Sequence, residues 1–423
     1  MSSPKSADLR TAAAAVVAML PGFLFPFILT LAKPASVSDS IMLALSIVTT
    51  LTSAVGTAIE LNTVSEFGRQ LSDGRMPSTS AMVSYRRRVY VFGLLTTGIV
   101  GPLLALLYAV GSDRSTDFLI VCGLMLGVSV ITVFSSVQSG ILIAHGEAGY
   151  AVALQFLRPT LPSILIIAWP AMPLLLLPLA FVLGEAVRYG LLSWKRNRIL
   201  SGYLANRDEK LESRGMLWQS FSAGMSQGAP IIDRVFLNAG PTGSISMYEL
   251  ADKLYFAAAQ FLNYGFLVRR VGRWSRIPTM TQQDARKLLR KDLTVVLGAA
   301  AVIAVVGITA ASVLQLLPLP SIWSQSLSWA MVLFASAPLT MWIMSASRLI
   351  VIARRQRLLP WLSALTLATN LVLDIIFFSL WGVFGIVLAT LGLRVCSAIV
   401  YAIVLWRILP SMTAPLAGQV SSG

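Results

Sequence analysis

The chain has 423 residues, of which 56% are hydrophobic and only 12% are charged. Because roughly a quarter of the residues in a soluble domain are charged, this composition excludes an ordinary soluble protein and indicates one that crosses a membrane many times. The formal net charge of +15 would suggest nucleic-acid binding in a soluble chain; here we expect it to reflect basic loops that set topology and contact anionic lipid.

Apolar runs of about 20 residues, the length that crosses a bilayer, recur along the whole chain. They predict twelve transmembrane helices, at 11–32, 40–61, 89–111, 117–144, 149–169, 171–194, 215–238, 244–267, 293–317, 325–352, 358–379 and 382–409. The fifth and sixth are separated only by "AWPAMP". No small-residue cleavage site follows the first apolar run, so we expect that run to be a span and not a signal peptide.

The basic residues predict an orientation for this layout. If every second loop is cytoplasmic, beginning with the N-terminal segment, and Arg407 at the end of the last span is counted with the cytoplasmic side, 25 of the 33 Lys and Arg residues lie inside. Six lie within spans, and only Lys33 and Arg114 lie outside. Such an imbalance is typical of the positive-inside rule. We therefore expect a multi-pass protein of a bacterial cytoplasmic (inner) membrane with both termini in the cytoplasm.

Two loop segments resemble each other and predict an internal repeat. "EFGRQLSDGRMPSTSAMVSYRRRVYVFGLL" follows the second span and "RVGRWSRIPTMTQQDARKLLRKDLTVVLGA" follows the eighth; each has Gly-Arg, a polar linker and a basic cluster before an apolar helix. The alternative is that any two cytoplasmic loops are basic. The predicted parts are an N-terminal six-helix half, a cytoplasmic linker, a C-terminal six-helix half and a cytoplasmic tail, at 1–194, 195–214, 215–409 and 410–423. Two such repeats are typical of an all-α transporter with a V-shaped central cavity between its halves.

Several charged residues fall inside predicted spans, where their cost usually marks a function. Arginine binds phosphate bidentately and keeps its charge when desolvated, so an anionic cargo is indicated. The candidate cargo-binding residues are Arg158, Arg394, Arg188, Arg348 and Arg234. Arg158 and Arg394 lie deepest, whereas Arg188 and Arg348 have the alternative of snorkelling to the interface. The candidate coupling or helix-pairing carboxylates are Asp233, Asp252, Asp374, Glu60 and Glu185.

The spacing of some charges predicts their partners. Glu185 and Arg188 are three residues apart, so they share a helix face and are able to pair. Asp252 and Lys253 are adjacent, hence about 100° apart on a helix, and we expect them to contact different neighbours. The charges around the turn between the seventh and eighth spans have two interpretations: they hold these spans to their neighbours, or they contact cargo.

The sequence offers little for metal, cofactor or catalytic chemistry. Cys122 and Cys396 lie in apolar runs and His145 is the single histidine, so we expect no metal site, no cofactor and no disulfide. The predicted outside loops are short, and the candidate catalytic acids or arginines in them are limited to Asp39, Asp113, Arg114 and, at the edge of a span, Asp117. These observations favour a transporter over an enzyme.

Two segments resemble a known superfamily. "GAPIIDRVFLNAGPTGSISMYELADKLYFAAAQFLNYGF" has an aspartate near a helix end, a Gly-rich turn and then S-x-x-x-Y-x-x-A-D-K-L, carried by Asp233, Gly240, Gly243, Ser244, Tyr248, Ala251, Asp252, Lys253 and Leu254. "NLVLDIIFFSLWGVFGIVLATLGLR" has a second pattern, carried by Asn370, Asp374, Gly382, Gly385, Ala389 and Thr390. Both resemble the Wzx-like and MurJ-like flippases of the multidrug/oligosaccharidyl-lipid/polysaccharide (MOP) exporter superfamily.

The resemblance implies a flippase that moves a polyprenyl-diphosphate-linked oligosaccharide across the membrane by alternating access. It also implies an undecaprenyl-diphosphate-linked saccharide and membrane lipids as partners, with a polysaccharide polymerase or glycosyltransferases, and no nucleic acid. MurJ-type lipid II flippases have basic residues in the first helix and commonly two further C-terminal helices, which are not found here. These departures favour an exopolysaccharide, O-antigen or capsule repeat unit as the cargo.

Three alternatives remain open from the sequence. The first is a lipid II flippase of peptidoglycan synthesis. The second is a cation-coupled multidrug antiporter on the same fold, which proton or sodium dependence of drug efflux would distinguish. The third is a membrane glycosyltransferase, polymerase or ligase, which would need catalytic residues in the outside loops.

Overall fold

The computed structural model describes residues 19–412, apart from 73–77, 110–115, 201–219, 222–223, 226, 268–269, 271–273, 275–280, 354 and 356. The described residues form helices and turns, with no strand among them. The chain divides into two compact units, Met1–Ser246 and Met247–Gly423. Each unit is a bundle of long helices, as the apolar runs predict.

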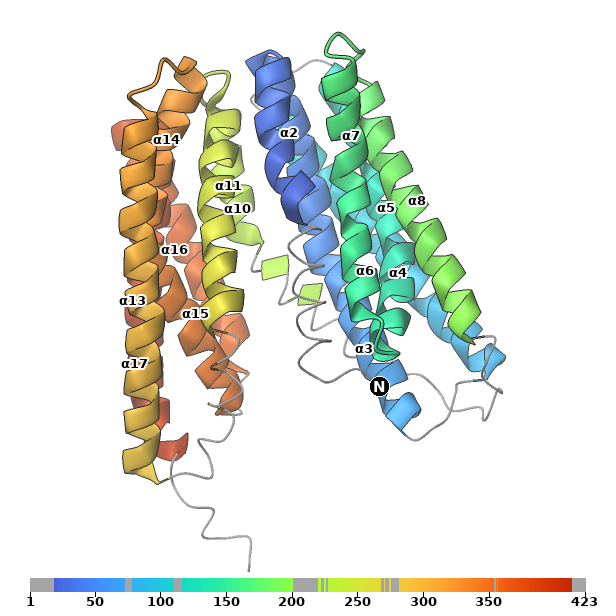
Figure 1. Ribbon diagram of the computed structural model, residues 1–423. Helices are drawn as coiled ribbons and strands as arrows, with labels where there is room; N and C mark the ends of the chain where they lie inside the picture. The colour runs from blue at the N-terminus through green and yellow to red at the C-terminus, as the bar shows by residue number, and fades with distance from the viewer. Residues whose placement is uncertain are drawn as a thin grey trace, which may run out of the picture. The chain divides into compact units, whose positions relative to one another are not determined.

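The first unit is arranged around α5. Its helices are Met19–Ala32, α2 (Ala35–Leu51), the π-helical turn η1 (Thr52–Gly56), α3 (Thr57–Ser72), α4 (Thr79–Ala109), α5 (Thr116–Ala144), α6 (Ala148–Ala153), the 3₁₀ turn η2 (Leu154–Phe156), α7 (Leu157–Ala168), α8 (Leu176–Leu200) and α10 (Gly228–Asn238). Helix α5 packs against α2, α3, α4 and α8, and α7 packs along α8 (Figure 1). The polar side chains of α5 between Ser129 and Ser139 are accordingly buried.

The second unit is also a helical bundle, in which α17 and α13 each pack against several other helices. Its helices are α11 (Ser244–Leu262, which begins in the last residues of the first unit), the π-helical turn η3 (Asn263–Leu267), α13 (Gln282–Leu314), α14 (Ser321–Ala335), α15 (Ala337–Ile352), α16 (Leu358–Trp381) and α17 (Val383–Met412). Helix α17 packs against α14, α15 and α16, while α13 packs against α14 and α15.

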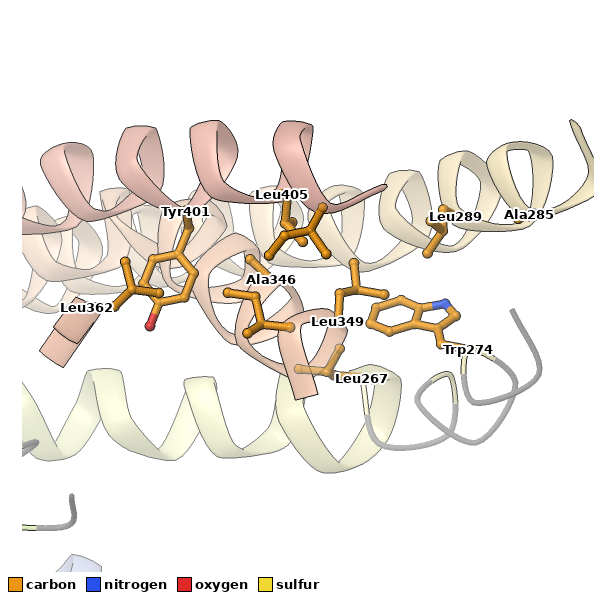
Figure 2. Packing of buried hydrophobic residues seen from close by; sticks show 11 residues of the cluster. Leu267, Trp274, Ala285, Leu289, Ala346, Leu349, Leu362, Tyr401 and Leu405 are labelled. Carbon is orange, nitrogen blue, oxygen red and sulfur yellow. The ribbon is translucent and has the colours of Figure 1, made fainter. Parts of the chain in front are cut away.

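A hydrophobic cluster in the second unit includes Trp274. The indole is fully buried and packs beside Leu349 and Leu267 (Figure 2). Its Nε1–H donates to the Asp292 Oδ2 at 3.0 Å, and the Arg270 Nε lies 3.7 Å from the other oxygen of that carboxylate. A buried indole N–H needs such an acceptor, so the carboxylate allows the tryptophan to be buried whole.

The outward faces of the helices are apolar, as a bilayer requires. Leu316 is 85% exposed, and the indoles of Trp361 and Trp406 are 77% and 78% exposed. Apolar surface on this scale would cause aggregation in water but is stable against lipid chains. Within the described residues, eight helices are long and apolar enough to cross a membrane, and a ninth span is counted if one bent pair is taken together.

Each of the twelve predicted ranges contains helix among its described residues, but several of these helices are not simple spans. The first is described only as the short apolar helix Met19–Ala32, and part of the seventh, 215–238, lies outside the described residues. The eighth, α11, is helical but carries Glu249, Asp252 and Lys253 and does not meet the same apolar criterion. The predicted domain limits at 194 and 214 remain a prediction.

The tenth predicted span, 325–352, is a bent pair and not a continuous helix. Helices α14 and α15 meet at an angle of 46° at Ser336, and Pro338 lies in the first turn of α15. Proline has no N–H for the preceding turn, so the helix ends there and restarts. The break places the buried Ser336 hydroxyl inside the second unit.

Candidate functional site

In the first unit, two of the candidate arginines converge on one carboxylate. Glu185 is completely buried on α8; its Oε2 accepts from the Arg158 Nε at 2.9 Å and its Oε1 from the Arg188 Nη1 at 2.8 Å. The Arg188 side chain is 4% exposed and that of Arg158 is 19% exposed. Arg158 also donates from Nη2 to the Thr132 Oγ1 on α5 at 3.0 Å.

A close approach of two helices makes this arrangement possible. A Cβ atom on Gly184 would lie 2.7 Å from the carbonyl oxygen of Leu157 and 3.1 Å from the Cα of Arg158. Only glycine allows α7 and α8 to come this near. The glycine beside Glu185 thus brings Arg158 to the carboxylate, while Arg188 reaches it from one turn along α8.

The charges of this cluster do not cancel. One carboxylate lies between two guanidinium groups, which leaves a net charge of +1 in a largely buried site. Burial of an ion pair is tolerated only when charges are compensated and hydrogen-bonded. Glu185 is therefore engaged by both arginines, and the cluster keeps an excess positive charge.

In the second unit, Arg394 is held without a carboxylate partner. Its guanidinium carbon lies 4.3 Å from the centre of the Tyr255 ring on α11, and its Nη1 donates to the Ser336 hydroxyl at the break between α14 and α15. Tyr255 is fixed in turn, since its hydroxyl donates to the Thr340 Oγ1 at 2.6 Å. Among the described residues, no carboxylate forms an ion pair with Arg394.

The two other candidate arginines have different surroundings. Arg348 is exposed on α15, as the snorkelling alternative expects. Arg234 is half-buried on α10, and its Nη1 donates to the carbonyl oxygen of Pro230 one turn earlier at 3.1 Å. The structure therefore assembles Arg158 with Arg188 but gathers neither Arg348 nor Arg234 into that cluster.

The remaining candidate carboxylates are dispersed. Asp374 is fully buried on α16 and accepts from the Asn370 Nδ2 at 2.8 Å, within the second of the two motifs. Asp233 is buried on α10, whereas Glu60 and Asp252 are half-buried on α3 and α11.

The adjacent pair on α11 contacts its neighbours differently, as expected from the sequence. The Lys253 Nζ lies 3.9 Å from the Glu249 Oε2, four residues earlier on the same helix. Glu249 itself is buried. Lys253 thus pairs with Glu249 on the same helix. The adjacent Asp252 points about 100° away from Lys253.

One carboxylate that caps a helix was not identified from the sequence. Asp39, expected in an outside loop, is buried on α2 and accepts from the backbone N–H of Gly243 at 2.7 Å and from the N–H of Ser246 at 2.9 Å. The Ser246 hydroxyl also donates to it at 2.6 Å. This carboxylate caps the N-terminus of α11, where backbone N–H groups lack partners and the helix dipole favours negative charge.

The local sequence around α11 explains why this cap was missed. Gly243 has a φ of 99°, a left-handed conformation that suits glycine at the turn before the helix. The first turn of α11 contains no acidic residue of its own. The carboxylate that caps α11, Asp39, lies about 200 residues earlier in the sequence. Its contact with the start of α11 is established only by the folded chain.

Within the described residues, no group of three or more His, Cys, Asp or Glu side chains is arranged to hold a metal ion. Of the two free cysteines, Cys122 is buried and Cys396 is exposed.

No family model matches the sequence, and no curated protein matches it. Solved structures with the same fold do exist. The lipid II flippase MurJ in an inward closed conformation has a TM-score of 0.70 and 13% identity, covering 96% of this chain and 89% of the other. An inward-facing multidrug resistance MATE family transporter of the MOP superfamily has a TM-score of 0.66 and 13% identity, covering 98% and 100%. A MOP superfamily transporter from Pyrococcus furiosus has a TM-score of 0.63 and 16% identity, covering 97% of each chain.

These likenesses concern the fold. They confirm the predicted all-helical fold, which the chain shares with these solved flippase and transporter structures. Because flippases and multidrug transporters share this fold, it does not identify a substrate. The choice between them depends on the side chains.

Proposed function

We propose that this protein is a flippase that moves a polyprenyl-diphosphate-linked oligosaccharide across the bacterial cytoplasmic membrane by alternating access. The observation that carries the proposal is Arg394, a guanidinium in a membrane-spanning helix that is held by a hydroxyl and an aromatic ring. Charge at membrane depth is costly unless it is compensated, and a passing anion supplies that compensation.

The geometry around Arg394 leaves hydrogen-bond donors for such an anion. A ring stacked on the face of a guanidinium stabilises its charge. The N–H groups lie in the guanidinium plane, so the ring does not block them from donating hydrogen bonds to another ligand. Within the part of the chain that the structure describes, only Nη1 donates a hydrogen bond, to Ser336. The remaining donors match the paired oxygens of a phosphate, which arginine binds bidentately.

The cluster in the first unit supports the same cargo. Arg158 and Arg188 share the single carboxylate of Glu185, so the cluster remains positive. Both oxygens of the Glu185 carboxylate are engaged by these guanidinium groups, so the cluster does not provide the unpaired carboxylate that a cation-coupled antiporter would use. The second candidate, a cation-coupled multidrug antiporter, is favoured by the buried Asp374 in the second unit.

The proposed saccharide is an exopolysaccharide, O-antigen or capsule repeat unit. The described first helix, Met19–Ala32, contains no basic residue, and Lys33 just after it donates to the carbonyl oxygens of Pro170 and Met172. The cationic first helix of lipid II flippases therefore has no counterpart in it. In this proposal a polymerase and glycosyltransferases act on the same lipid carrier, and both termini are cytoplasmic.

The test is a leaflet assay with the full chain in proteoliposomes. The probe is a fluorescent undecaprenyl-diphosphate oligosaccharide, and its loss of fluorescence to an external quencher reports flipping. Arg394→Ala should reduce the rate at least about tenfold, since it removes a charge-assisted contact. Arg348→Ala, which removes the same charge from an exposed site, should flip at the wild-type rate.

Two outcomes would contradict the proposal. One is an Arg394→Ala protein that is correctly folded and flips the probe at the wild-type rate. The other is a deletion strain with normal surface polysaccharide and no lipid-linked intermediates on the cytoplasmic leaflet. Drug efflux that depends on a proton or sodium gradient and is lost in Asp374→Asn would instead support the antiporter.

A further inference from the structure

A second cationic cluster in the first unit joins two arginines, Arg86 and Arg196, through the neutral side chains of Tyr90 and Gln138. The Arg86 Nε on α4 donates to the Tyr90 hydroxyl at 3.3 Å, and the same oxygen accepts from the Gln138 Nε2 on α5 at 3.2 Å. The Gln138 Oε1 accepts from the Arg196 Nη1 on α8. Gln138 is completely buried, so three helices meet at this relay.

The cluster has an excess of donors and no negative charge. Among the described residues, no carboxylate forms an ion pair with Arg86 or Arg196, and the two terminal nitrogens of Arg86 make no hydrogen bond. Tyr90 already accepts two hydrogen bonds, which leaves its own O–H to donate. Arg196 directs its Nε and Nη2 to the side chain of Asn197 and keeps further N–H groups.

Aromatic rings shape the surroundings of the relay. The Arg86 guanidinium lies 5.7 Å from the Tyr90 ring centre, and Phe134 packs edge-on against Tyr90 with ring centres 4.7 Å apart. Tyr189 on α8 contacts the other side of Phe134, with ring centres 6.2 Å apart. Both arginines are half-buried among these rings, so their mutual repulsion is screened less than it would be at an open surface.

The position of the cluster indicates the origin of its ligand. The N-terminal part of α4 and the C-terminal part of α8 lie at the same end of the first unit (Figure 1). The positive-inside pattern assigns this end to the cytoplasmic surface, where the headgroups of anionic lipids lie. Two guanidinium groups and a phenol O–H provide the donors that a phosphate accepts.

We propose that Arg86 and Arg196, joined by Tyr90 and Gln138, bind a phosphate group carried by a membrane-borne lipid. Two sources fit this chemistry: the headgroup of an anionic phospholipid, and the diphosphate of a polyprenyl carrier. The site is distinct from Arg394, and it does not require the proposed transport activity.

The experiment measures lipid retention by the full chain. Wild-type protein is placed in phosphatidylcholine nanodiscs that contain either phosphatidylglycerol or undecaprenyl diphosphate, and the lipids that remain bound after detergent release are counted by native mass spectrometry. Retention of either lipid is expected, and the arm that gives it identifies the source. The double variant Arg86→Ala/Arg196→Ala should weaken retention at least about tenfold, because two charge-assisted contacts are lost.

Arg87→Ala is the matched control for charge. Arg87 neighbours Arg86 but is exposed, so its removal should leave retention unchanged. Equal loss in Arg87→Ala would reduce the cluster to general surface charge and overturn the proposal. So would retention of neither lipid, or binding of inorganic pyrophosphate alone, measured by calorimetry in phosphatidylcholine discs.

A charge-preserving variant covers the case in which the alanine variants do not fold. Arg86→Lys/Arg196→Lys keeps both charges but removes the planar forks, and we expect retention to fall about threefold or more. Unchanged retention in this variant would overturn the proposed geometry. Leaflet transport, which tests Arg394, is measured separately, so the two proposals fail independently.

Discussion

Replacing Glu185 by glutamine is the most direct test of the buried cluster in the first unit. Glutamine keeps the size of the side chain and one acceptor oxygen but removes the charge between Arg158 and Arg188. The Glu185 carboxylate is completely buried and accepts from both guanidinium groups, at 2.9 and 2.8 Å. The variant therefore leaves two neighbouring cations with no carboxylate between them.

The magnitude follows from these contacts. Each charge-assisted hydrogen bond contributes about 1.5–3 kcal/mol, and removing one partner of a buried ion pair costs about 3–5 kcal/mol of folding free energy. Arg188 is 4% exposed and bears the full effect, whereas Arg158 is 19% exposed and keeps its bond to Thr132. We therefore expect a loss near the lower limit, about 3 kcal/mol.

The assay is reversible unfolding of the full chain in mixed micelles with increasing SDS, followed by tryptophan fluorescence. Glu60→Gln is the matched control, because it removes the same charge from a half-buried position that forms no ion pair with the described residues. Glu185→Gln/Arg188→Met should recover part of the loss, since an apolar replacement of a buried pair is often nearly neutral. A Glu185→Gln protein within about 1 kcal/mol of wild type would refute the reasoning.

Two further predictions concern helix contacts in the first unit. Gly184→Ala should destabilise the protein by about 1–3 kcal/mol in the same assay, because its Cβ would lie 2.7 Å from a backbone carbonyl of α7; Gly190→Ala on the same helix meets no atom within 4 Å and should be neutral or slightly stabilising. Asp39→Asn should increase amide hydrogen exchange at Gly243 and Ser246, with a local loss of about 1–2 kcal/mol, because it weakens the cap and its interaction with the helix dipole. Exchange at the start of α13, where Thr281 caps the N–H of Asp284, should not change, and an equal increase there would point to general loosening instead.

The charged side chains separate what local sequence predicts from what it does not. Glu185 and Arg188 are three residues apart on one helix, so their pairing is a consequence of helical periodicity alone. Arg158 joins them from 27 residues away, because Gly184 lets two helices touch. The ring and hydroxyl that hold Arg394 come from α11 and from the α14–α15 break, and no spacing in the sequence connects them.

By itself the sequence indicated an all-helical membrane protein, predicted the positions of most of the described helices, and contained two segments that resemble the MOP superfamily. Hydropathy depends on the local sequence, and a bilayer admits few backbone structures. The local sequence is therefore enough to predict membrane-spanning helices. Only the tertiary structure showed which charged side chains form ion pairs and that the chain bends by 46° between α14 and α15. It also showed that Asp39 caps a helix about 200 residues away. These features depend on which helix faces pack together, and packing brings together side chains whose separation in sequence carries no periodic signal.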